Sequence, residues 1–199
     1  ATANLMGVVM RRLARFPEAL KWLEQAQKLD PRAVSPFVNK ANVYIALGDG
    51  PRAKEALRRA VRQEPKVAEH HRMLGVAHRL TGDIEGAKQK FQVALSLDAR
   101  NMQAWIDLAG ALQELQQGEE CLAVLEEALK TLGEPRQLVE AKIKVLRSLG
   151  RTAEAETWTT ALLERYPEAG WLHYQLGRSV APRDRDRANR HFRDAVRFS

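Results

Sequence analysis

The chain has 199 residues, of which 45% are hydrophobic and 29% are charged, and its formal net charge is +7. This composition supplies enough apolar material for a core and excludes a chain that is disordered by composition. No apolar run approaches the roughly 20 residues that span a bilayer, so we expect a soluble protein, cytoplasmic or periplasmic. The single cysteine, Cys121, excludes an internal disulfide but does not decide between these compartments.

The first residues, ATANLMGVVMRRLARF, contain an apolar patch with no basic residues before it. This arrangement argues against a signal peptide. The segment also lacks an initiator methionine, so we expect the sequence to be part of a longer protein.

The sequence repeats with a period of 34 residues. One series of small or apolar residues belongs to a predicted first helix: Gly7, Ala41, Gly75, Ala109, Ile143 and Gly177. Three series belong to a predicted second helix: Ala19, Ala53, Ala87, Cys121, Ala155; Leu23, Leu57, Phe91, Leu125, Thr159; and Ala26, Ala60, Ala94, Ala128, Leu162. The repeats are therefore 1–33, 34–67, 68–101, 102–135, 136–169 and 170–199, the last with one residue fewer near 181–184.

Each repeat is predicted to form two helices. In the fourth repeat, apolar residues follow helical spacing in the order Trp105, Leu108, Leu112 and Leu115. First helices end in Gly or polar turns: Gly48-Asp49, Thr81-Gly82-Asp83 and Gly150-Arg151. Second helices end near Pro31, Pro65 and Pro167, where proline stops a helix. Small residues at the recurring places let two helices approach closely.

On these residues the chain resembles the tetratricopeptide repeat family. The residues that carry the resemblance are Trp105, Leu108, Ala109, Ala128; Leu74, Gly75, Gly82, Ala87, Phe91, Ala94; and Ala41, Tyr44, Gly48, Ala53, Leu57, Ala60, Pro65. The resemblance implies an all-α fold, a right-handed solenoid of about six helix-turn-helix repeats that forms a single domain over residues 1–199. It also implies that first helices line a concave groove and second helices a convex face.

No catalytic constellation is found in the sequence, which contains no glycine-rich phosphate loop and no motif around a Ser-His-Asp set. His71 and His78 lie two helical turns apart, roughly 10 Å, too far for one metal ion to bridge. Both occupy places where the family has packing residues, and Cys121 occupies an alanine place. We therefore expect a protein that is not an enzyme, with no cofactor and no metal site.

Charge is distributed unevenly along the repeats. Residues 102–135 contain one Lys and seven Asp or Glu, a net charge of −6, whereas both ends of the chain are basic. This acidic belt argues against nucleic acid as a partner, because a phosphate backbone requires a continuous basic track. It leaves open a basic partner for the belt, or an acidic partner for basic residues on the convex face: Arg52, Arg58, Arg59 and Arg62.

Basic and amide side chains also recur on the predicted first helices. The resemblance places the following candidate partner-binding residues in the concave groove: Asn42, Arg72, Arg79, Gln113, Lys144, Arg147, Tyr174 and Arg178. Arginine offers a planar set of donors that suits carboxylate, sulfate or phosphate. Some family members clamp the carboxylate of chaperone tails, but Val38, Glu69 and Met73 break that pattern here.

We therefore expect a non-catalytic scaffold that binds a protein or peptide, acidic or rich in acceptors, in the groove. The resemblance leaves an alternative open: a repeat arm of a larger enzyme of glycosyltransferase, sulfotransferase or hydroxylase type, or of a polysaccharide-export envelope protein. The last helix shows no polar cap, so we also expect Phe192, Val196 and Phe198 to be unpacked and to promote weak self-association through the C-terminal repeat.

Overall fold

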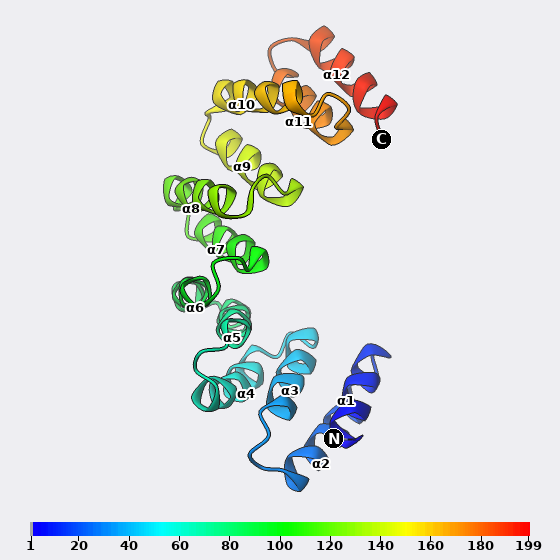
Figure 1. Cartoon of the computed structure of the whole chain (residues 1–199), viewed down its shortest axis with the longest axis vertical. Helices are drawn as coiled ribbons and strands as arrows, with labels where there is room; N and C mark the ends of the chain where they lie inside the picture. Colours follow the sequence, from blue (N-terminus) through cyan, green and yellow to red (C-terminus); the bar gives the residue numbers. More distant parts are fainter. Residues whose placement is uncertain (1) are drawn as a thin grey trace. The chain divides into compact units, whose positions relative to one another are not determined.

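The computed structural model describes residues 2–199, which form twelve α-helices and no β-strand (Figure 1). The predicted all-α class is confirmed, and each predicted repeat contains two helices. Their bounds are α1 Thr2–Arg12, α2 Phe16–Leu29, α3 Ser35–Ala46, α4 Gly50–Gln63, α5 Ala68–Leu80, α6 Ile84–Leu97, α7 Met102–Glu114, α8 Gly118–Leu132, α9 Arg136–Ser148, α10 Thr152–Arg165, α11 Gly170–Val180 and α12 Arg185–Arg197. Within residues 2–199, no helix is both long and apolar enough to cross a lipid bilayer.

The chain divides into two compact units, one that ends at Gln116 and one that covers Gln117–Ser199. The boundary falls between α7 and α8, inside the fourth predicted repeat. A single continuous domain over residues 1–199 therefore stays a prediction, and each unit is described by itself.

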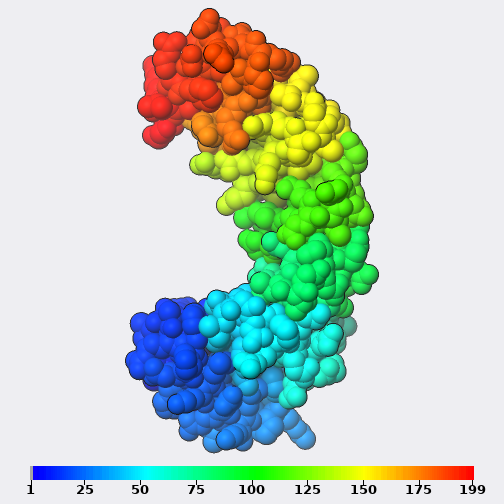
Figure 2. All heavy atoms as spheres, turned by 180° about the vertical axis from the view of Figure 1, so that it is seen from behind, coloured from blue at the N-terminus to red at the C-terminus, as the bar shows by residue number. Residues whose placement is uncertain are grey.

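Successive helices pack against one another within each unit, as expected for helical hairpins joined by short turns. In the first unit, α1, α3, α5 and α7 also approach one another in sequence, and in the second unit α9 approaches α11. Among the described residues of each unit, second helices do not approach each other in this way. First helices thus line one side of each unit and second helices the other. Figure 2 shows the atoms of successive segments of each unit in contact, with colours that follow the sequence.

The recurring small residues form the core of the helix pairs. Ala19, Ala53, Ala87 and Ala155 are all fully buried, as is Cys121 at the same place of the fourth repeat. The only polar member of the recurring series is Thr159, which is also buried, and its hydroxyl donates to the carbonyl oxygen of Ala155 at 2.6 Å. The sequence period therefore identifies core positions, and the one polar substitution is satisfied by its own helix.

The turns inside the repeats also recur with the 34-residue period. The second residue after each of five helices has a positive φ: Ala14, Gly48, Gly82, Gln116 and Gly150. Glycine adopts this left-handed conformation without strain, which explains its presence at three of these places. Four helices begin at a side-chain cap that accepts a backbone N–H bond: Asp49, Asp83, Asn101 and Asp184.

The C-terminal helix is better packed than the sequence predicts. Phe192 is half-buried and contacts a core cluster of Leu176, Val180 and Ala188. Phe198 stacks against the ring of His173 at a centroid distance of 5.7 Å. The expectation that both phenylalanines lack partners is therefore wrong, because α11 supplies them. Of the three apolar residues named for this helix, only Val196 is exposed, at 79%.

Candidate functional site

The eight candidate residues occupy three places of the first helix, and each place recurs every 34 residues. Asn42, Lys144 and Arg178 share one place, Arg79, Gln113 and Arg147 a second, and Arg72 and Tyr174 a third. Within each unit, these residues belong to the side that the first helices line. Their surroundings nevertheless differ between the two units.

In the first unit, the arginines are engaged in ion pairs. Arg72 on α5 donates to both carboxylate oxygens of Glu69, at 2.7 and 2.8 Å, and to Asp107 on α7 at 2.6 Å. These hydrogen bonds, first of all those to Glu69, raise the pKa of Arg72 above its ordinary value. Asp107 accepts a further bond from Gln103 at 3.1 Å. Arg72 therefore links two repeats, because three of its nitrogen atoms already donate hydrogen bonds to Glu69 and Asp107.

Arg79 and the two amide candidates complete the first unit. The guanidinium of Arg79 lies 2.9 Å from the carboxylate of Glu114, and both side chains are about two-fifths exposed. Asn42 on α3 and Gln113 on α7 are half-buried. An anionic ligand at this unit would compete with Glu114 and Asp107 for the same donors.

In the second unit, three candidate cations surround one open pocket of about 520 Å³. Lys144 and Arg147 come from α9 and Arg178 from α11. Within the described chain, none of the three has a carboxylate within ion-pair distance. The remaining lining residues are Glu140, Ser148, Thr152, Gln175, Ser179 and Pro182.

The electrostatics of this pocket favour an anion. Glu140 is its only carboxylate among the lining residues, and that carboxylate already accepts from Arg136 at 2.9 Å. Burial, and then the neighbouring charge of Arg178, lower the pKa of Arg147. The guanidinium of Arg178 lies 5.8 Å from the ring centroid of Tyr174, which orients it by a cation–π contact. Two guanidinium groups that repel each other are stabilised when an anion binds between them.

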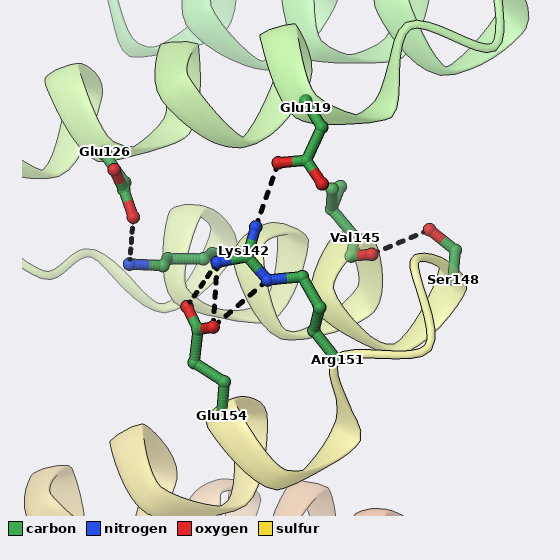
Figure 3. Close-up of polar contacts among 7 residues, drawn as sticks. All are labelled: Glu119, Glu126, Lys142, Val145, Ser148, Arg151 and Glu154. Atoms are coloured by element: carbon green, nitrogen blue, oxygen red, sulfur yellow. Dashed lines mark hydrogen bonds and ion pairs between the residues drawn. The ribbon is translucent and has the colours of Figure 1, made fainter.

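Three carboxylates of the acidic belt pair with basic residues of the following repeat. Figure 3 shows Arg151 between Glu119, at 2.9 Å, and Glu154, at 2.8 Å. Lys142 binds Glu126 at 2.9 Å in the same region. At the other end of α8, Arg165 binds Glu134 at 2.6 Å. These contacts reduce the charge that the belt offers to a basic partner.

The histidines and the cysteine of the sequence analysis lie in packed positions. His71 is buried, with Nε2 at 2.8 Å from the carbonyl oxygen of Pro65. The Nδ1 atom of buried His78 lies 2.6 Å from the Asp83 carboxylate, which takes part in the cap of α6. Cys121 is fully buried.

The sequence analysis did not identify the polar side chains that complete the pocket. Thr152 lies at the start of α10, and Gln175 lies one turn before Arg178 on α11. Their spacing carries no signal, because they join the site only when α10 and α11 pack beside α9. Only the recurring places that contain Lys144, Arg147 and Arg178 could be recognised from the sequence.

Comparison with known proteins shows which family the chain matches. Two models, each described as tetratricopeptide repeat, match residues 38–104 and 79–143. The TPR repeat-containing protein PA0015 of Pseudomonas aeruginosa is 39% identical over 56 residues, which are 28% of this chain and 53% of that protein. Tetratricopeptide repeat protein 33 of Homo sapiens is 31% identical over 113 residues, 55% of this chain and 43% of that protein. The chain thus spans about half the length of these relatives.

Solved structures share the fold at low sequence identity. TTC0263 of Thermus thermophilus, described as a thermophilic TPR protein, has a TM-score of 0.60 and 21% identity, with 98% of each chain covered. YrrB, described as a TPR protein with an unusual peptide-binding site, has a TM-score of 0.62 and 20% identity, covering 89% of this chain and 92% of its own. A MamA fragment from Desulfovibrio magneticus has a TM-score of 0.65 and 19% identity, covering 83% and 94%.

Proposed function

Because the chain belongs to the tetratricopeptide repeat family, we propose that it is a non-catalytic scaffold that binds an acidic segment of a protein partner at the pocket of α9 and α11. Proteins of this family generally mediate protein–protein interactions. The observation that carries the proposal is the group of three cations, Lys144, Arg147 and Arg178, around one pocket without a carboxylate partner of their own.

A peptide suits this pocket better than an isolated small ion. The pocket is open and is lined along α9 and α11, so an extended chain can enter and leave it. Arginine and lysine supply charge-assisted donors, while Thr152 and Gln175 supply neutral donors and acceptors for a peptide backbone. YrrB, which shares the fold, is described as having a peptide-binding site.

The proposal narrows the set of eight candidate residues. Lys144, Arg147 and Arg178 contact the partner, and Tyr174 holds Arg178 in place. Arg72 and Arg79 take a secondary part, because Asp107 and Glu114 compete for them. The alternative of a repeat arm attached to a larger enzyme or export protein stays a prediction from the resemblance.

Fluorescence anisotropy with a labelled, glutamate-rich synthetic peptide tests the proposal. The double variant Lys144→Gln/Arg147→Gln should weaken binding by about tenfold or more, which corresponds to ~1.4 kcal/mol. The matched control is Arg58→Gln/Arg62→Gln, which removes two exposed positive charges from α4. Both double variants therefore have the same net charge. Equal weakening by both double variants would show that only net charge matters, and the pocket would lose its assignment.

A further inference from the structure

Two histidines and an aspartate from the last two helices converge in the second unit. His173 belongs to α11, whereas His191 and Asp194 belong to α12. One potential ligand atom of each residue lies within 4.8 Å of the others, and all three residues are half-buried. We propose that these side chains form a binding site for a divalent transition-metal ion of the zinc type, which joins α11 to α12.

The distance between the two imidazoles fits a shared metal ion. The Nδ1 atoms of His173 and His191 are 3.4 Å apart. Two nitrogens bound tetrahedrally to zinc at roughly 2.0–2.1 Å stand about 3.3–3.4 Å apart. The same separation is long for a direct hydrogen bond, whose donor and acceptor usually lie within about 3.2 Å.

The outer nitrogen of His173 is held as metal-binding histidines usually are. Its Nε2 lies 3.0 Å from the carbonyl oxygen of Pro167, an atom that can only accept. Nε2 therefore carries the proton in the neutral ring, and the lone pair of Nδ1 faces His191 and Asp194. A second N–H bond of this kind fixes the tautomer and the ring orientation at metal sites.

The third ligand and the surroundings are compatible with a cation. The Asp194 carboxylate lies 3.9 Å from Nδ1 of His173, and it is 41% exposed, so a small side-chain rotation brings it to the ion. Phe198 covers His173 on one side. Of the nearby arginines, Arg187 is paired with Glu156, which reduces its repulsion of a bound ion.

Nitrogen and carboxylate ligands suit zinc and its neighbours in the first transition series, with water in a fourth position. The proposed site lies on α11 and α12, and it does not share a side chain with the pocket of Lys144 and Arg147. It is therefore independent of the proposed function. The sequence analysis expected no metal site, because the one histidine pair that it weighed, His71 and His78, lies two turns apart on one helix.

Calorimetric titration of the tag-free, chelator-treated chain with Zn²⁺ tests the site. The wild type should bind one ion per chain, and His191→Gln or Asp194→Asn should each weaken binding at least about tenfold. Asp186→Asn changes the same residue type on the same helix, outside the cluster, and should bind like the wild type. Zinc should also raise the thermal midpoint of the wild type and not of His191→Gln, since an ion bound only to the folded state stabilises it.

Cobalt absorption identifies the ligands. Weak d–d bands without a thiolate charge-transfer band are expected for nitrogen and oxygen ligands, whereas such a charge-transfer band would assign the ion to Cys121 and overturn the proposal. Failure of the wild type to bind zinc, or equal binding by the wild type, His191→Gln and Asp194→Asn, would overturn it too. If circular dichroism shows that His191→Gln is misfolded, the comparison between the wild type and Asp194→Asn is used instead, because Asp194 is partly exposed.

Discussion

Arg147 and Arg178 line one pocket from two adjacent first helices, and burial, followed by the charge of Arg178, lowers the pKa of Arg147. In Arg178→Gln, the repulsion between the two charges is removed, so the free energy of unfolding at low salt should stay within about 0.5 kcal/mol of the wild type or increase. Sulfate should raise the thermal midpoint of the wild type more than that of the variant, with chloride of equal ionic strength as the control. A large loss of stability in Arg178→Gln would show instead that this side chain is structural.

Arg72 and Asp107 should behave in the opposite way. Their side chains are only 19% and 11% exposed, so Asp107→Asn removes one of the two carboxylates that a mostly buried guanidinium binds, while Glu69 stays bound. We expect a loss of about 1.5–3 kcal/mol in the free energy of unfolding, measured by urea denaturation. Glu114→Gln removes the corresponding partner of exposed Arg79 and should cost no more than about 1 kcal/mol. Similar losses in both variants would contradict the difference in burial.

Gly75 is needed because of Phe91. A Cβ atom at residue 75 would lie 2.5 Å from the phenylalanine ring, so Gly75→Ala should destabilise the protein by about 1–3 kcal/mol. The preceding repeat has Ala41 and Leu57 at the same two places, both fully buried. The double variant Gly75→Ala/Phe91→Leu should therefore lose less stability than the sum of its single variants in urea denaturation. Strictly additive losses would show that the two residues do not share the space.

Asp83 should make stability depend on pH. Its hydrogen bond with His78, followed by that from the Gly86 backbone, lowers the pKa of Asp83. A lowered pKa stabilises the folded state above the unfolded value, about 3.9, and this contribution is lost as the pH falls through the folded pKa. Asp83→Asn should thus be less stable than the wild type near pH 7, with the difference shrinking in acid. Glu85→Gln, an exposed carboxylate on the same helix, should show a smaller pH-dependent difference by thermal unfolding.

Weak self-association of the chain should depend on Val196. This residue is 79% exposed beside a pocket of about 670 Å³ that Trp171, Tyr174 and Phe198 help to line. Burial of one such side chain contributes roughly 1.5–3 kcal/mol, so we expect concentration-dependent dimers in sedimentation velocity. Val196→Asp should shift the population to monomer, whereas Arg193→Asp, an exposed change on the same helix, should affect it less. A wild type that stays monomeric at high concentration would remove this contact.

Local spacing was sufficient to predict the helix pairs and their core. A period of 34 residues with small side chains such as Ala53, Ala87 and Ala155 leaves few ways to pack two helices closely, and the structure buries all three. The missing residue near 181–184 was also predicted from the period. The structure agrees, because Ala188 and Ala195 are buried one residue earlier than an unbroken period requires.

The sequence by itself determined the repeat, the all-α class and which residues recur at the same places of the first helices. Only the tertiary structure decided that Arg72 is bound by Asp107, that Lys144, Arg147 and Arg178 share a pocket, and that His173 meets His191. These partners lie on different helices: His173 and His191 are 18 residues apart, and Arg72 and Asp107 are 35 residues apart. Periodicity fixes the direction of each side chain from its own helix, but the partner depends on how neighbouring helices pack, because charge and ligand interactions act over only a few ångströms.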